Sequence, residues 1–552
     1  MNTDNSILNN LAESEKWVWQ TLHNDEIADF NCYYNTSIVP ASEAGWTSER
    51  ALSGDFLRNL LISLEDTKTL PRRRIRIVGA WFKEGIDLSG WNISIEFSIT
   101  QSRFEQNVCL AHMRTSNQVI FDHSYFARDL DCHSLQSSRS ILLHAIRADQ
   151  MVKMDEVVTT ESVIFSGIQG VTIHLRAARI SRDLNVEGGK LSNSLDMEGA
   201  VIGGNVLMGQ YSEFKNIKMT CAEIAGNLRL QAKVSGVVDL YSVVVKQELD
   251  LADSTLNDLY VVAAHIGKQV FGTGLSVENK ASFGALTVDG HFIMHNAKMG
   301  EINLINARIG GQFGITNTNI SRHATLANLF VGTEMYLEKL TFDKSENIQI
   351  DLHGAQINGS LRLTGMKAQR LNLALVVINR NLKIENSTAL EEVDLQFAQI
   401  HGIVTFSGIG IEKSLTMRNI SVGGSFSIEQ ESMLYDIQFD NGKISSTLAI
   451  SSSCVKGALN AQSFVVSGDV SLRQSVFTGE LRIINSSLNG NLCSCCCQFG
   501  SLDLSGTVIR NELRLEEGNT WSDDSLLNLR NVTVSTFWDA GEKSWPQTLE
   551  LE

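Results

Sequence analysis

The segment Gly199-Ala200-Val201-Ile202-Gly203-Gly204-Asn205-Val206-Leu207 decides the fold of this chain. It consists of a small residue, a branched residue two positions later, a glycine or polar corner, and then alternating aliphatic positions. The same pattern returns at residues 222–230, 306–313 and 354–363, about every 22 residues. A repeat period of roughly 20 to 50 residues is the signature of a solenoid.

Proline is almost excluded from the repeating region. None occurs between Pro71 and Pro546, where average usage would place roughly two dozen. Because proline cannot donate a main-chain hydrogen bond, its absence is typical of a structure in which nearly every amide bonds to a neighbouring strand. The repeat therefore favours a β-solenoid over a helical one.

The branched residue of each repeat anchors an alignment of the whole region. Most steps between anchors are 21 or 22 residues, and the longer steps predict insertions at about 147–165, 343–349 and 518–525. Loops that leave a regular scaffold often carry recognition. The anchors are Phe82, Phe104, Phe126, Ile146, Ile180, Ile202, Ile224, Val245, Ile266, Val288, Ile309, Val331, Ile357, Ile378, Ile400, Val422, Ile444, Val466, Leu488, Ile509 and Val534.

Columns of the alignment separate an inner from an outer face. Six positions after the anchor the residue is aliphatic, as at Met208 and Leu230, and the period-two alternation predicts that it points inward. Three positions after the anchor it is polar, as at Asn205 and His291, and is expected to point outward. Glycine recurs two positions after the anchor, as at Gly204, where coils approach closely.

These features predict an all-β chain forming a right-handed parallel β-helix over residues 71–535, with about 20 coils of about 22 residues. At about 4.8 Å per coil the rod would be on the order of 100 Å long. A pentapeptide solenoid is less well supported, because the coils exceed 20 residues and the aliphatic spacing is four and then two.

The two ends of the chain differ from the repeats. Residues 1–70 are expected to form a small α-helical cap, with one helix near 11–22 and another that Ser48 caps and on which Leu52, Phe56, Leu60 and Leu64 recur. Residues 536–552 stop in mid-alternation without a capping helix. We therefore expect this terminal segment to be truncated before a further C-terminal region.

Bulk composition limits the environment of the protein. The 552 residues carry a net charge of −16, which argues against direct binding of nucleic acid or an anionic membrane. No apolar run is long enough to span a membrane, and the polar N-terminus lacks a signal-peptide pattern. Nine cysteines without framework spacing indicate reduced thiols in a cytoplasmic protein.

Two segments carry a resemblance to known proteins. One runs from Leu70-Pro71-Arg72-Arg73-Arg74 to Gly85-Ile86-Asp87-Leu88, and the other from Thr536-Phe537-Trp538-Asp539 to Trp545-Pro546-Gln547. With the repeats between them, the chain resembles a poorly characterised group of bacterial β-helix repeat proteins, some labelled membrane-associated oxidoreductases. The resemblance implies the fold and a C-terminal region that reaches the membrane. The sequence contains no dinucleotide fingerprint and no haem or flavin signature, so we do not carry the redox label over.

Three clusters are weighed as candidate sites. Cys493, Cys495, Cys496 and Cys497 are metal or redox candidates, but side chains that alternate along one strand cannot all converge on one ion, so packing is favoured. Asp289, His291 and His295 could form an acid–base group. The basic run Arg72, Arg73, Arg74 and Arg76 could contact an anion or a partner, or could pair with acidic residues of the cap.

The sequence thus predicts a non-catalytic scaffold or protein-interaction module that binds a protein partner and needs no cofactor or metal. It would be cytoplasmic, at the inner face of a membrane that it reaches through a region absent from this chain. Stacking of open coils on another copy, end to end or side by side, is also expected. One alternative is an acidic DNA mimic that blocks a DNA-binding enzyme. A second is a carbohydrate-active β-helix enzyme, although no tryptophan lies between Trp91 and Trp521 to line a sugar cleft.

Overall fold

A computed structural model describes residues 11–66, 74–342, 349–541, 545–546 and 548–551. The chain is all-β, with 49% strand and 6% helix, and forms a parallel β-solenoid of about 21 turns with about 22 residues per coil, as predicted. It divides into two compact units: unit 1 comprises residues 1–271 and 276–278, and unit 2 comprises residues 272–275 and 279–552.

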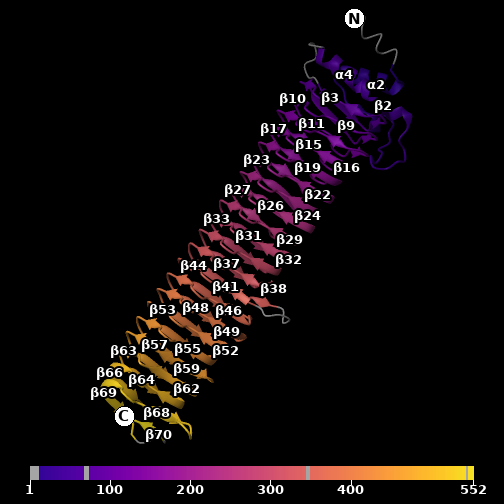
Figure 1. Ribbon diagram of the computed structural model, residues 1–552. Helices are drawn as coiled ribbons and strands as arrows, with labels where there is room; N and C mark the ends of the chain where they lie inside the picture. The colour runs from indigo at the N-terminus through magenta and orange to yellow at the C-terminus, as the bar shows by residue number, and fades with distance from the viewer. Residues whose placement is uncertain (1–10, 67–73, 343–348, 542–544, 547, 552) are drawn as a thin grey trace. The chain divides into compact units, whose positions relative to one another are not determined.

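Helices gather at the N-terminal end of unit 1, where a cap was predicted (Figure 1). They are α2 (Glu13–His23), α3 (Phe30–Tyr33) and α4 (Gly54–Asp66), with a 3-10 turn at Ser48–Arg50. In the helices that the structure describes, no segment is long and apolar enough to cross a membrane.

The prediction that Ser48 caps a helix containing Leu52 is wrong. The helix α4 begins at Gly54, and the hydroxyl of Ser53 accepts a 3.1 Å hydrogen bond from the Phe56 amide. Leu52 instead lies in β2 (Ala51–Leu52), paired with Phe82 of β4 (Trp81–Phe82). Pairing with the first coil therefore overrides the helical spacing of the leucines.

Each coil of unit 1 consists of two half-coils of similar length, a subdivision that the repeat period did not predict. A residue with positive φ marks the corner of each half-coil, at His112, His123, Ser134, Ala145 and Glu156. Parallel main-chain bonds join one coil to the next at these corners; the His112 amide, for example, donates to the His133 carbonyl at 2.8 Å. In the first coils most of the straight parts are two-residue strands, whereas later coils of unit 1 contain longer strands.

The predicted anchors fall into two different columns in unit 1. Ile180, Ile202, Ile224, Val245 and Ile266 pair in register, as expected. The early anchors lie in the other half-coil: Phe82 pairs with Phe104, Phe104 with Phe126, and Phe126 with Ala148 rather than with Ile146. Both half-coils bury every second residue. The sequence pattern is therefore the same in the two columns, and an alignment based on that pattern does not distinguish them.

The insertion predicted at 147–165 does not exist. Ile180 pairs with Thr159, and Thr159 pairs with Ser137, so this column continues at the ordinary coil length. The long step from Ile146 to Ile180 is the change of column just described. Residues 147–153 form the regular strand β16 (Arg147–Lys153).

Unit 2 follows the predicted alignment throughout. Its anchors pair in a single column from Val288 to Val534.

Pairing confirms the other two predicted insertions. Ile320 pairs with Phe342, whereas the nearby Ala324 pairs with Ile350, so extra chain separates the two partners; residues 343–348 themselves lie outside the described part. Likewise Phe499 pairs with Trp521, and Leu502 pairs with Leu527. The segment from Trp521 to Leu527 is longer than the segment from Phe499 to Leu502 that it pairs with, so it contains extra residues.

Aromatic rings fill the core of the first coils. Phe82, Phe104 and Phe126 are fully buried and stack nearly parallel, with centroids 4.9 and 4.7 Å apart. Each buried phenylalanine contributes about 2–3 kcal/mol through loss of apolar surface. The stack ends where the column continues with the small residues Ala148 and Gly170.

Candidate binding groove

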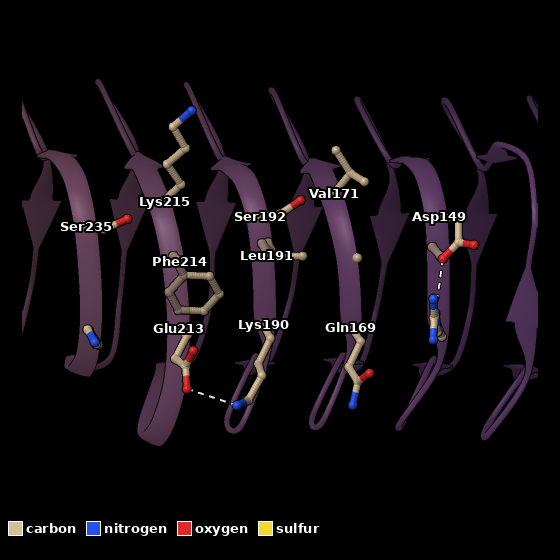
Figure 2. A pocket seen from close by; sticks show the side chains of 14 residues that line it. Asp149, Gln169, Val171, Lys190, Leu191, Ser192, Glu213, Phe214, Lys215 and Ser235 are labelled. Atoms are coloured by element: carbon tan, nitrogen blue, oxygen red, sulfur yellow. Dashed lines mark hydrogen bonds and ion pairs between the residues drawn. The ribbon is translucent and has the colours of Figure 1, made fainter. Parts of the chain in front are cut away.

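An open groove crosses five neighbouring strands of unit 1 and has a volume of about 820 Å³ (Figure 2). The strands are β16 (Arg147–Lys153), β19 (Gln169–His174), β22 (Lys190–Asp196), β24 (Val206–Lys218) and β26 (Leu228–Asp239). Its side chains come from successive coils, and each strand contributes residues at equivalent positions of the coil.

We divide the lining into two rims and a floor. The first rim consists of Arg147, Gln169, Lys190, Glu213 and Lys233, which pair in register from strand to strand. The second rim consists of Asp149, Val171, Ser192, Lys215 and Ser235. The floor consists of Ala148, Gly170, Leu191 and Phe214, each of which stands between the two rim residues of its strand in the sequence.

A recurring β-bulge shapes this face. The pairing shifts register after Ala148, Gly170 and Leu191, immediately beyond the floor. The inserted residues leave the hydrogen-bonded ladder, and Ser192 among them is exposed. Bulges bend a strand and redirect its side chains, and they are common beside functional sites. Here the same distortion repeats in successive coils and produces a continuous concave strip.

The groove is positive in an otherwise acidic chain. Its lining contains four cations and two carboxylates, a net charge of +2, whereas the whole chain carries −16. The carboxylates are neutralised locally: Arg147 lies 3.1 Å from Asp149, and Lys190 lies 2.9 Å from Glu213. The hydrogen bond from Lys190 lowers the pKa of Glu213, so this carboxylate is ionised at neutral pH.

Two lysines of the groove are not held in an ion pair, although the charge of Lys233 contributes to lowering the pKa of Glu213. Within the described part of the chain, Lys215 and Lys233 form no ion pair, and both are exposed. Figure 2 shows Lys215 extended away from the Lys190–Glu213 pair. These two ammonium groups are available to an anionic group that enters the groove.

A polar network joins the groove to the coil beneath the cap. The Tyr125 hydroxyl donates to Asp149 at 2.7 Å, and the guanidinium of Arg103 lies 4.5 Å from the centre of the Tyr125 ring. Burial, with the added effect of Asp149, raises the pKa of Tyr125, so the phenol keeps the proton that it donates. Arg103 is itself held by Glu105 at 2.6 Å.

The cap covers this same column just before the groove opens. Arg103, Tyr125 and Arg147 are register partners on successive strands. A terminal nitrogen of Arg103 donates to the main-chain carbonyls of Pro40 and Ser42 at 3.0 and 3.2 Å. An irregular segment of the cap therefore covers this column at Arg103. Further along the same column, Arg147 is not covered by the cap.

The structure separates the two histidines of the predicted acid–base cluster. His291 immediately precedes β34 (Phe292–His295) and His295 ends it, about 13 Å apart at the usual strand rise. The Gln312 amide donates to Nδ1 of His291 at 3.0 Å, whereas Nδ1 of His295 lies 2.6 Å from the Thr316 hydroxyl. Each histidine thus contacts a different residue of the next coil, and Asp289 is exposed.

The polar column that contains His291 forms ladders between coils. In unit 1 the Asn205 amide donates to the Asp183 carboxylate at 2.7 Å, and the Asn227 amide donates to Asn205 at 2.9 Å. A Cβ at Gly226 would lie only 2.6 Å from the Asn205 side-chain oxygen, which confirms the predicted role of the glycine column. These residues satisfy main-chain groups at a corner, which accounts for their polarity.

The four cysteines do not alternate along one strand as expected: Cys493 and Cys495 share the outward face of β64 (Leu492–Cys495), and Cys496 and Cys497 follow the end of that strand. Cys493 and Cys495 are half-buried, Cys496 is exposed at a corner with φ 53°, and Cys497 is buried. Burial raises the pKa of Cys493 and Cys497. Among the described residues, no group of three or more histidine, cysteine or acidic side chains is placed to hold a metal ion.

The described part of the basic run is paired within the protein. Arg74 lies 3.3 Å from Asp25, just after α2, and Arg76 lies 2.8 Å from Glu96 of the next coil. Arg72 and Arg73 lie outside the described residues. The pairing of Arg74 with an acidic residue of the cap agrees with one of the two interpretations given above.

Comparison with known proteins identifies no relative: no family model, no curated protein and no solved structure matches this chain. The resemblance to bacterial β-helix proteins therefore stays a prediction, and the geometry of the groove carries the functional argument.

Proposed function

We propose that this chain is a non-catalytic β-solenoid scaffold that binds a protein partner in the groove of unit 1. One observation carries the proposal: the rims present two ammonium groups that form no ion pair with the described residues, in a concave strip of an otherwise acidic chain. The hydroxyls of Ser192 and Ser235 and the amide of Gln169 add hydrogen-bonding groups at the spacing of the coils. All nine cysteines are free thiols, which supports a cytoplasmic location.

The arrangement of the carboxylates favours binding over glycoside hydrolysis. Asp149 and Glu213 lie on coils three steps apart, about 14 Å along the solenoid at the usual strand spacing. The two catalytic acids of glycosidases lie about 5 to 10 Å apart. Neither rim contains an aromatic residue on which a sugar ring could stack.

The distribution of charge also gives little support to a DNA mimic. Such a protein would present an unbroken row of carboxylates, but many acidic side chains here pair with a cation of an adjacent coil. Lys218 with Glu198, Arg370 with Glu392, and Lys413 with Glu391 are examples.

Site-specific photo-crosslinking in the native host tests the proposal. A benzoylphenylalanine at Ser192 would project into the groove, and one at Thr478 provides a matched control, because Thr478 is an exposed bulge residue of unit 2. We expect one partner crosslinked from Ser192, absent from the Thr478 sample, and lost when Lys215 and Lys233 are both changed to Glu. Equal products from both positions, or none from Ser192, would refute a partner in the groove.

A further inference from the structure

We infer that the groove binds an extended acidic peptide segment that crosses the coils from Arg147 toward Lys233. This inference rests on the proposed function and names the chemistry of the partner. It follows from a comparison of two arginines on one column, only one of which is covered by the chain itself.

Arg103 and Arg147 have the same local arrangement. Each donates through Nε to the carboxylate two residues further along its own strand, Arg103 to Glu105 at 2.6 Å and Arg147 to Asp149 at 3.1 Å. Each guanidinium also lies near the ring of Tyr125, at 4.5 and 6.0 Å from its centre. The pairing with a carboxylate fixes the guanidinium; in Arg103 one terminal nitrogen also donates to Glu105, at 3.4 Å, and the other terminal nitrogen binds the cap.

The two arginines differ in what covers them. The side chain of Arg103 is 6% exposed, because its terminal nitrogen binds the carbonyls of Pro40 and Ser42 in the cap. The side chain of Arg147 is 52% exposed, and within the described residues its terminal nitrogens donate to no protein group. At Arg103 this column binds the main chain of an irregular segment of the cap. Arg147 offers a similar guanidinium on the same column, and no segment of the described chain covers it.

The rest of the groove sets the length and charge of the peptide. Arg147 and Lys233 are four coils apart, about 19 Å, which corresponds to roughly six residues of extended chain. Lys215 and Lys233 lie at the far end and form no ion pair with any residue that the structure describes, so carboxylates of the peptide are expected there. Contacts to main-chain carbonyls at Arg147 and to carboxylates at the lysines would fix its register.

Nucleic acid and anionic oligosaccharide fit less well. Single-stranded nucleic acid is usually bound by stacking of bases on exposed aromatic rings, whereas both rims lack them and Phe214 on the floor is 3% exposed. Two unpaired lysines also supply far less charge than a row of phosphates would require.

Fluorescence polarisation with defined probes tests the inference. The probes are a fluorescein-labelled octapeptide of alternating Glu and Val, and its counterpart with Gln in place of Glu. We expect the acidic probe to bind, and the double substitution Lys215→Glu with Lys233→Glu to weaken it at least about tenfold. Arg147→Ala is expected to weaken both probes, because it removes a contact to the main chain.

A matched variant separates the groove from the overall charge. Lys246→Glu with Lys268→Glu makes the same change in net charge at exposed positions of unit 1 outside the groove. We expect it to leave the affinity within about twofold, with circular dichroism confirming that both variants fold. Equal weakening by the two pairs would overturn the inference, because the effect would then be long-range.

Other results distinguish this inference from the proposed function. Binding of a single-stranded DNA dodecamer or of an oligogalacturonate that depends on Lys215 and Lys233, without binding of the acidic peptide, would overturn the peptide assignment. Absence of all probe binding, together with a partner crosslinked from Ser192, would overturn the inference and leave the scaffold standing. Failure of the crosslinking as well would remove both.

Discussion

The Tyr125 hydroxyl donates a 2.7 Å hydrogen bond to Asp149, and this contact connects the covered part of an outward column to its open continuation. On one side of the Tyr125 ring lies Arg103, bound to the cap. On the other side Asp149 holds Arg147 at the entrance of the groove. The orientation of Arg147 therefore depends on a residue that does not itself line the groove.

Tyr125→Phe should weaken binding in the groove and modestly destabilise unit 1. The loss of one hydrogen bond to a charged group costs about 1.5 to 3 kcal/mol. Asp149 would also lose a contact that orients it, and Arg147 depends on Asp149 for its own orientation. We expect the affinity for the acidic probe to fall two- to fivefold, with a lower midpoint of urea denaturation. Tyr211→Phe serves as the control, since Tyr211 is 82% exposed. Unchanged affinity with reduced stability would show that Tyr125 acts only in folding.

Ser192→Trp should block the groove without loss of stability. Ser192 is an exposed residue of the second rim, so the indole would fill space rather than disturb the core. We expect loss of probe binding and a change in the free energy of unfolding within about 0.5 kcal/mol, as is usual for surface substitutions. Thr478→Trp in unit 2 should leave binding unchanged. Normal binding by the Ser192 variant would place the ligand elsewhere.

Phe104→Ala should destabilise the first coils more than the later ones. Phe104 lies between Phe82 and Phe126 in the stack, and removal of a buried phenylalanine costs about 3 to 5 kcal/mol. Because solenoid coils contact mainly their neighbours, hydrogen exchange should accelerate over residues 82–126 and stay slow around Ile266. Equal acceleration along unit 1 would show that the unit unfolds in a single step.

Leu375→Asn should stabilise unit 2. Leu375 adopts φ 58° at a corner and is 48% exposed, so its side chain gains little from packing. A positive φ costs a branched residue about 1 kcal/mol or more, whereas asparagine tolerates it. Asparagine also bridges such corners, as where Asn328 donates to Asn306 at 3.2 Å. The midpoint of thermal denaturation should rise for this variant and should fall for the reverse change, Asn419→Leu.

The sequence was sufficient for the period, the strand class and the cap, because these depend on repeated local patterns. It was insufficient to decide which of the two half-coil columns the anchors of the first coils occupy. Phe126 is followed in its column by Ala148, and a small residue in an aliphatic column cannot be recognised without the pairing. Ile146 lies two positions before Ala148 and is of the aliphatic type expected for an anchor. The alignment therefore took Ile146 in place of Ala148, and the later anchors fell in the other column.

The groove could not be predicted because its residues are ordinary when taken one at a time. Their relation appears only when the coils are stacked, since the rims combine single positions from five strands. A signal was nevertheless present, because Lys190 and Lys233 stand two repeat lengths apart in the sequence. The unusual residues that drew attention, His291 and Cys495, contact neighbours in ladders and corners instead.

Cys495 should react slowly with alkylating reagents despite its partial exposure. The contact with the Cys496 thiol, 3.5 Å away, together with burial, raises the pKa of Cys495 to about 11. The thiol is therefore protonated at pH 8, and its thiolate forms only as the pH rises toward 11. We expect iodoacetamide to modify it about tenfold more slowly at pH 8 than an ordinary thiol, after allowance for the greater nucleophilicity of a more basic thiolate.

The pH profile of this alkylation provides the decisive measurement for Cys495. Mass spectrometry of the modified peptide should show a rate that still increases between pH 9 and pH 10.5. In Cys496→Ala the principal cause of the raised pKa is absent, so the profile should level off at lower pH and the rate at pH 8 should increase. A plateau near pH 9 in the unmodified chain would contradict the raised pKa, and would restore Cys495 and Cys496 as a reactive pair.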